Sequence, residues 1–302
     1  MLGSYSNGNY RIAIMEDGTK VRYTAEDEYK PEFAESIDLT ITKKCDGGCK
    51  FCYMGCTPEG KHSDIFKFAP FIESLKPYTE VAINGNDLSH PQLDALLSIL
   101  KERNVIANMT VNAKHLIQHK AHLANLIMSG YIHGLGISPI GGTVLPDEVI
   151  QFASVYKNCV IHVINGIFDR SLFSKLEGKD IKLLILGYKQ SGQGIDYRER
   201  NKDKIAFNMK WLQDHIVPVT SAFNVVTFDN LAIDQLELRD SKLDINWDLD
   251  YMGDEGEFTF YADLVDGYYA VTSFDEVMYP IESRNAIDCF QDIRRKVGKY
   301  AQ

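Results

Sequence analysis

The sequence lacks any apolar run long enough to span a membrane and any apolar N-terminal stretch of the signal-peptide type. It is also short of positive charge, because 32 Lys and Arg stand against 42 Asp and Glu and leave a net charge of −10. Nonspecific nucleic-acid binding needs a cationic surface, so we expect none, and we expect no association with membranes. These absences predict a cytoplasmic protein, and 302 residues suffice for one large core with small additions.

Cysteine is scarce as well, and its placement is uneven. Of the six cysteines, Cys45, Cys49 and Cys52 are crowded into one loop with the spacing C-x3-C-x2-C. Such crowding indicates a metal site and not a disulfide framework. Three thiolates are one fewer than a [4Fe–4S] cluster takes, since each iron has one ligand. One iron would then be open to a small molecule.

The same count leaves a zinc site open. Cys56 supplies a fourth thiol and His62 follows closely, so the four donors that zinc needs are available. Zinc sites usually come as two C-x2-C pairs or as Cys and His combinations, and this spacing fits them less well. Cys159 and Cys289 fall in strand and helix patterns, which predicts that they are core residues.

Apolar strands alternate with helical patterns from residue 36 onward. This alternation predicts parallel strands joined by right-handed crossovers, and six such units make a partial, open (β/α)6 barrel, an α/β fold. In this architecture the chemistry gathers at the carboxyl ends of the strands, and the cysteine loop follows the first strand. The predicted strands are 36–42, 80–83, 107–111, 134–138, 160–164 and 181–186.

We expect three parts: an N-terminal β-ribbon over 1–35, the barrel core over 36–200, and a C-terminal extension over 201–302. In the ribbon, alternation over 10–14 and 20–23 predicts a hairpin.

The C-terminal extension is predicted to begin with a strand and a helix, over 224–229 and 231–238, that extend the barrel edge. An aromatic β-hairpin over 257–264 and 268–273 follows, and a helix over 285–297 ends the pattern. We interpret the hairpin as a lid or edge sheet that packs on the barrel. The alternative is an aromatic platform on which a base stacks.

The segment from Ile41 to Tyr53, including the aromatic Phe51 before the third cysteine, resembles the signature of the radical S-adenosylmethionine (SAM) superfamily. The resemblance implies that Cys45, Cys49 and Cys52 hold a [4Fe–4S] cluster whose open iron chelates the amino and carboxylate groups of SAM. It implies also that the reduced cluster cleaves SAM and that a 5′-deoxyadenosyl radical abstracts hydrogen from the substrate. It extends over roughly residues 36 to 195.

Polar and glycine residues at the predicted strand ends match positions that bind SAM in this superfamily. Asn84-Gly85-Asn86-Asp87 resembles the G-G-E-P segment that holds the SAM amino group, but Asn86 replaces the Glu. An Asn oxygen still accepts from an ammonium, without the charge that strengthens the bond, and Asp87 is placed to supply that charge. The resemblance assigns SAM binding also to Asn112, Ser138, Asn165 and the loop Gly187 to Gly194, including Gly187 and Gly192. Singly, each of these residue types is common in caps and turns.

The resemblance therefore predicts a radical SAM enzyme whose leading substrate class is a peptide or protein side chain. A nucleotide or nucleic-acid base is the enzymatic alternative. An iron–sulfur redox-sensing or regulatory protein is a second alternative, which the Asn86 substitution keeps open, and a structural zinc protein is a third. Cys56 either packs or donates a hydrogen atom to a substrate radical.

Such an enzyme needs a reducing partner such as flavodoxin or ferredoxin. Lys43, Lys44, Lys50 and Lys61 surround the cysteine loop and form a local basic patch on an acidic protein. Docking of an acidic electron donor is one interpretation of this patch. Ordinary solvated lysines are the other.

Overall fold

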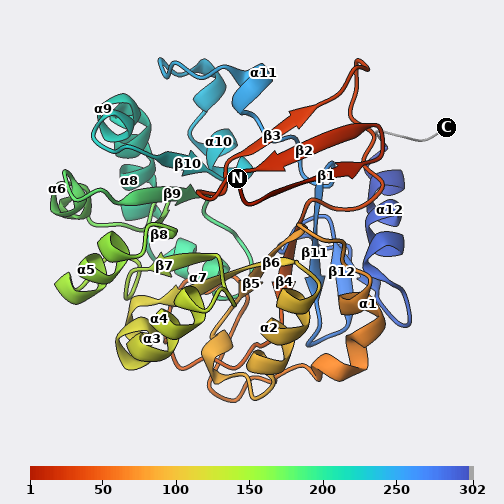
Figure 1. The fold of residues 1–302 in the computed structure, drawn as a ribbon. Coiled ribbons are helices and arrows are strands. Elements are labelled where there is room, and N and C mark those ends of the chain that lie inside the picture. Colours follow the sequence, from red (N-terminus) through yellow and green to blue (C-terminus); the bar gives the residue numbers. More distant parts are fainter. Residues whose placement is uncertain (299–302) are drawn as a thin grey trace.

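A mostly parallel sheet of ten strands organises the chain in the computed structural model, which describes residues 1–298 (Figure 1). The strand order is β10-β9-β8-β7-β6-β5-β4-β11-β12-β13. The eight strands from β10 to β11 run parallel, and β12 and β13 add two antiparallel strands at one edge. The strands are β4 (Ser36–Thr40), β5 (Glu80–Asn84), β6 (Ile106–Asn112), β7 (Gly134–Ser138), β8 (Cys159–Ile164), β9 (Lys182–Leu186), β10 (Val226–Phe228), β11 (Thr259–Asp263), β12 (Tyr268–Ala270) and β13 (Tyr279–Pro280).

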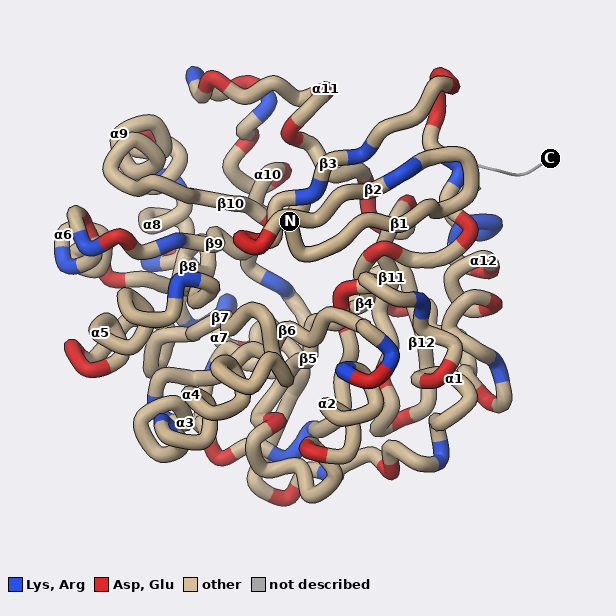
Figure 2. The backbone as a smooth tube through the Cα atoms, in the orientation of Figure 1, with Lys and Arg blue, Asp and Glu red and all other residues tan. Residues whose placement is uncertain are grey.

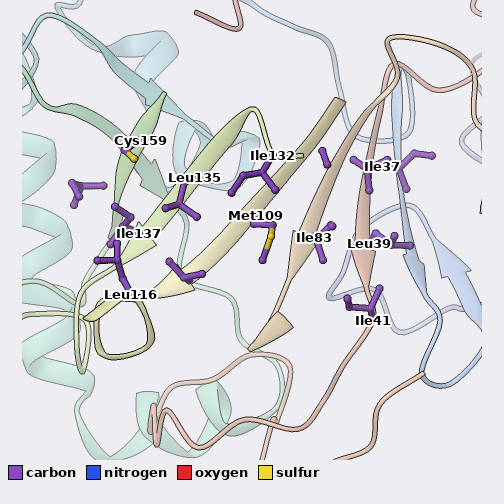
Figure 3. Close-up of a cluster of buried hydrophobic side chains, with 14 of the residues drawn as sticks. Ile37, Leu39, Ile41, Ile83, Met109, Leu116, Ile132, Leu135, Ile137 and Cys159 are labelled. Carbon is purple, nitrogen blue, oxygen red and sulfur yellow. The ribbon is translucent and has the colours of Figure 1, made fainter. Parts of the chain in front are cut away.

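The parallel strands have two chemically different faces, because successive side chains of a strand point to opposite sides of the sheet. One face carries large aliphatic residues, which are buried side by side on successive strands (Figure 3). The other face carries small or polar residues at the intervening positions. In β5, for example, Val81 and Ile83 are fully buried, whereas Glu80, Ala82 and Asn84 border a cavity.

Helices supply the apolar side chains that pack on the aliphatic face. The longest regular example on the first half of the chain, α2, buries four leucines at helical spacing. The helices are α1 (Ala69–Glu73), α2 (Leu93–Glu102), α3 (Ala113–Gln118), α4 (Lys120–Met128), α5 (Asp147–Val155), α6 (Ser171–Leu176), α7 (Gln193–Arg200), α8 (Lys202–Asp214), α9 (Ile216–Ser221), α10 (Asn230–Gln235), α11 (Trp247–Asp250) and α12 (Ala286–Lys296), with short 3-10 helices η1 (Ile65–Phe68), η2 (Asp87–Ser89) and η3 (Leu238–Asp240).

A separate antiparallel sheet is formed by β1 (Gly3–Asn7), β2 (Tyr10–Ile14) and β3 (Lys20–Tyr23). Its apolar face, with Tyr10, Ile12 and Ile14, packs on Ile106 and Phe258 in a small core of its own. Ile106 is the first residue of β6, and Figure 1 places the small sheet across the same end of the large one. The N-terminal sheet therefore covers the amino ends of the parallel strands.

Ionic contacts fix this cover to the large sheet. Glu35, which precedes β4 and is 1% exposed, accepts hydrogen bonds from Arg22 Nε at 2.7 Å and from the Tyr10 hydroxyl at 2.7 Å. Lys20 Nζ lies 2.5 Å from a carboxylate oxygen of Glu80, at the start of β5. Buried charges of this kind are stable only when paired.

The expected α/β fold is confirmed, and the large sheet is wider than the six parallel strands predicted. The ribbon hairpin and the edge strand β10 form where expected, whereas β1 was not predicted. The aromatic hairpin also forms, as β11 and β12, but β11 pairs in parallel with β4 and so continues the main sheet. Its aromatic residues Phe260, Tyr261 and Tyr269 are almost fully buried, so their rings are core.

Two further findings concern hydropathy and charge along the chain. Within residues 1–298 no helix is both long enough and apolar enough to cross a membrane. Acidic and basic residues are interspersed along the backbone in the view of Figure 2.

Candidate functional site

A cavity of about 1030 Å³ lies on the polar face of the parallel strands. Side chains from β4 through β10 line it, and residues 17–20 of the N-terminal sheet line its amino end. At the carboxyl end it is bordered by the cysteine loop. This volume is at the upper end of those usual for small-molecule pockets, so it has room for more than one small molecule.

The cysteine loop leaves β4 and is held by backbone hydrogen bonds to its own returning segment. Cys45 N donates to Thr57 O at 2.8 Å, and Thr57 N donates to Lys43 O at 3.1 Å. Gly60 permits this return, because a Cβ there would lie 2.0 Å from the Lys43 carbonyl oxygen. The polypeptide between Cys45 and Thr57 is thus a closed loop with fixed ends.

Asp46 ties the same loop to the helix that follows β6. Its carboxylate lies 3.0 Å from Lys114 Nζ and 2.7 Å from His115 Nε2. Hydrogen bonds from these two side chains lower the pKa of Asp46 to about 2. The loop is therefore anchored to α3 over the whole neutral pH range.

The thiols of Cys45, Cys49, Cys52 and Cys56 all border the cavity. The sulfurs of Cys45 and Cys49 lie 3.2 and 3.9 Å from the point that a Cβ on Gly47 would occupy, so they converge on one side of the loop. The Asn112 amide nitrogen lies 3.8 Å from the Cys49 sulfur. Burial raises the pKa of Cys49 to about 11, and the neighbouring Cys52 and Cys45 add to the shift.

Cys52 and Cys56 form a pair. A hydrogen bond between their thiols lowers the pKa of Cys52 and raises that of Cys56. Cys56 therefore lies beside the sequence triplet and faces the same space.

In the described part of the chain, no three His, Cys, Asp or Glu side chains are close enough to share one metal ion. The four cysteines thus border the cavity, with Cys45 near Cys49 and Cys52 near Cys56, but no three of them share one ion-sized site. A cluster of several irons, each taking its own thiolate, accommodates donors distributed in this way.

The loop after β9 packs directly on the cysteine loop. Gln193 N donates to Cys52 O at 3.0 Å, and the Ser191 hydroxyl donates to Tyr53 O at 3.1 Å. Gly192 has φ +52°, and a Cβ there would lie 2.4 Å from Tyr53 O and 2.8 Å from Cys52 O. Gly192 is thus required for the contact between two backbones, and it does not line the cavity.

The other predicted SAM-binding residues divide into two groups. Asn84, Gly85, Asn112, Ser138 and Gly187 line the cavity, as the expectation requires. They come from the carboxyl ends of four different strands, which parallel pairing brings to one edge.

Asn86, Asp87 and Asn165 do not line the cavity. The Asn86 amide turns toward Asp46, at 3.5 Å from its carboxylate. Asp87, in η2, is fully buried with no hydrogen-bond partner for either carboxylate oxygen among the described residues, and burial raises its pKa well above the ordinary value. Asn165 is also fully buried, and its side-chain nitrogen donates to Gln235 at 3.3 Å.

Several cavity residues were missed by the sequence reasoning. Asp38 lies between the buried Ile37 and Leu39, and His162 lies between Ile161 and Val163. Burial lowers the pKa of His162 to about 4, so its ring is neutral at pH 7. The signal for both was present, because a polar side chain alternating with aliphatic ones marks the inner face of a strand.

Of the lysines around the loop, Lys43 is already paired. Its ammonium contacts the carboxylates of Asp263, at 2.8 Å, and Asp266. Lys44, Lys50 and Lys61 are exposed.

No known protein family matches the chain, and no curated protein does.

Proposed function

We propose that the protein is a radical SAM enzyme in which Cys45, Cys49 and Cys52 hold a [4Fe–4S] cluster. The observation that carries the proposal is the position of the three thiols. They border the carboxyl end of a large cavity whose wall presents polar groups from successive strand ends. The donor set, three thiolates without a fourth ligand from the triplet, fits a cluster with one accessible iron.

The proposal includes a partial barrel as the form of the parallel sheet. The alternation of aliphatic and small or polar residues supports it, since one face is covered by helices and the other borders the cavity. Gly136 makes room on this face for the His162 ring, because a Cβ there would lie 2.3 Å from His162 Nε2. Small residues on the inner face leave the volume that two small molecules need.

When bound, the cluster would supply reductive cleavage of SAM and, through it, a carbon radical able to abstract hydrogen from a substrate. The chain's own residues bind and orient. Asn84, Gly85, Asn112 and Ser138 offer amide, backbone and hydroxyl groups to SAM beside the thiols. Asn86 and Asp87, which face away from the cavity, do not support the role of a charged partner for the SAM ammonium.

The N-terminal sheet has a role in excluding water. It covers the amino end of the cavity through Glu35, Arg22 and Lys20, so substrate and solvent enter elsewhere. A protected interior is what a reactive radical needs. The leading substrate class is a peptide or protein side chain.

A flavodoxin or ferredoxin would donate the electron that reduces the cluster. With Lys43 engaged by two aspartates, Lys44, Lys50 and Lys61 are the exposed cations near the loop that such an acidic partner would contact.

The test is anaerobic reconstitution with iron and sulfide, followed by dithionite and SAM, with 5′-deoxyadenosine measured by chromatography. We expect product from the native sequence and none from Cys45→Ala. Absence of product from protein that carries a full cluster would favour the sensor alternative. Protein that retains zinc and takes up no cluster would favour the structural zinc alternative.

A further inference from the structure

Four ionisable side chains meet on the cavity wall, away from the sequence motifs. Asp38 comes from β4, Lys189 from the loop after β9, Asp229 from the N-cap of α10, and Glu255 from the segment before β11. They are close enough to shift one another's pKa values. Three acids therefore face one base.

The lysine is held in place by its surroundings. Lys189 Nζ donates to the Ser273 hydroxyl at 3.0 Å and lies 4.4 Å from the centre of the Tyr53 ring. Burial disfavours its charge, but Tyr53, Asp38, Asp229 and Glu255 together keep the pKa of Lys189 above its usual value. Lys189 is thus a fixed cation that offsets one carboxylate.

The three carboxylates differ in the hydrogen bonds and ion pairs that they form. Asp229 accepts backbone hydrogen bonds from Gly187, at 2.8 Å, and from Ala232, at 2.7 Å, so its role is to cap α10. Asp38 and Glu255 accept no hydrogen bond and form no ion pair within 4 Å in the described residues, although both border the cavity. Because no side chain within bonding distance neutralises these two carboxylates, both retain the capacity to bind a cationic group that enters the cavity.

Asp38 and Glu255 lie near the cysteine loop, so a cation that they bind would lie near the proposed cluster site. Tyr53, which contacts Lys189, directly follows Cys52, so the acidic wall adjoins the proposed cluster site. A cation bound by Asp38 would lie on the inner face of the strand that carries the cysteine loop.

We infer that the cavity binds its substrate through a cationic nitrogen group, an ammonium or guanidinium such as a lysine or arginine side chain carries, with Asp38 and Glu255 as the accepting carboxylates. The inference rests on the proposed function and narrows its substrate class. It disfavours nucleotides, because phosphate groups would be repelled by the same two carboxylates.

The test measures binding without turnover. Full-length, anaerobically reconstituted protein is titrated by calorimetry with Nα-acetyl-lysine amide and Nα-acetyl-arginine amide in the presence of saturating SAM. The neutral Nε-acetylated lysine derivative and AMP serve as ligand controls. We expect at least one cationic amide to bind at least about tenfold more tightly than either control ligand.

Variants assign the binding to the two carboxylates. The double change Asp38→Asn with Glu255→Gln should weaken the cationic ligand roughly tenfold or more, whereas Glu276→Gln, which removes an exposed carboxylate outside the cavity, should leave its affinity unchanged. Equal affinity for the cationic and neutral lysine derivatives would overturn the inference, and this comparison needs no variant. Loss of cation binding when SAM is added would also overturn it, because the acids would then belong to the SAM subsite.

The two proposals fail separately. If SAM yields 5′-deoxyadenosine while cationic amides bind no better than neutral ones, only the substrate inference is wrong. If cationic amides bind selectively and no 5′-deoxyadenosine forms, the binding site stands and the proposed function is wrong.

Discussion

Gly192 lies against the carbonyl oxygen of Cys52, so closely that a Cβ at position 192 would come within 2.8 Å of that oxygen. The contact joins the loop after β9 to the last cysteine of the triplet, two segments far apart in sequence. The geometry of the thiols therefore depends on a glycine that touches none of them.

This relationship predicts that Gly192→Ala displaces the cysteine loop. Residues with a side chain rarely adopt φ +52°, and the new Cβ would also meet two backbone oxygens, so we expect a loss of roughly 2–4 kcal/mol of unfolding free energy. Urea unfolding measures this, and iron bound per chain should fall in parallel. Gly178→Ala is the matched control, because Gly178 has φ +70° with open space around it and should cost only about 1 kcal/mol. Equal effects of the two changes would contradict the packing role of Gly192.

The cysteines give a second prediction. Cys45→Ser, Cys49→Ser and Cys52→Ser should each abolish the bound cluster, seen as loss of its broad visible absorbance after anaerobic reconstitution. Cys56→Ser should retain the absorbance, because Cys56 is outside the triplet although it is hydrogen-bonded to Cys52. If Cys56→Ser loses the cluster like the others, four thiolates hold the metal and the open iron of the proposed enzyme is lost.

The local pattern of the sequence was sufficient to predict the early strands, the ribbon hairpin and the place of the cysteine loop at a strand end. It also placed the aromatic strand that forms β11, but it did not predict the parallel pairing of β11 with β4, because that pairing joins residues 259–263 and 36–40, more than 200 residues apart, and leaves no local signal. β1, with the sequence Gly-Ser-Tyr-Ser-Asn, has few residues typical of strands.

In the site, too, some residues could be predicted from the local sequence and others depend on long-range pairing. Asn84, Ser138 and the cysteines were found because they follow strands in the sequence. The meeting of Asp38 with Glu255 depends on how the sheet brings β4 near the segment before β11, which only the long-range pairing determines. The orientation of Asp87, turned into the protein by the short helix η2, was likewise not encoded in the motif.

The N-terminal cover gives a third prediction. Glu35→Gln would leave the buried charge of Arg22 without its carboxylate, and breaking a buried pair on one side costs about 3–5 kcal/mol. Urea unfolding of the variant measures the loss. Glu26→Gln, which removes an exposed carboxylate paired with Lys30, should leave the free energy of unfolding nearly unchanged. A Glu35→Gln variant as stable as the native protein would show that this buried network does not hold the cover in place.

The fourth prediction concerns pH and Glu255. Burial and the charge of Asp38 raise the pKa of Glu255 from 4.5 to about 7, against the opposing charge of Lys189 and with smaller contributions from Asp229 and Asp275. The folded protein thus keeps a proton that the unfolded chain releases between about pH 4.5 and 7. The Glu255 contribution to the free energy of unfolding therefore falls as pH rises through this window and is constant above it.

Glu255→Gln removes this pH dependence. We compare the unfolding free energy of the variant with that of the native protein at about pH 5 and at about pH 8. The difference, variant minus native, should be about 1 to 3 kcal/mol larger at the higher pH, as measured by urea unfolding. Glu276→Gln should show no such gain, because its carboxylate is exposed. A cationic amide added to the native protein at the higher pH should restore part of the stability, since it compensates the charge that the folded state otherwise leaves unpaired. If the native protein and Glu255→Gln keep a constant difference at both pH values, the carboxylate does not titrate in the folded state as its surroundings require.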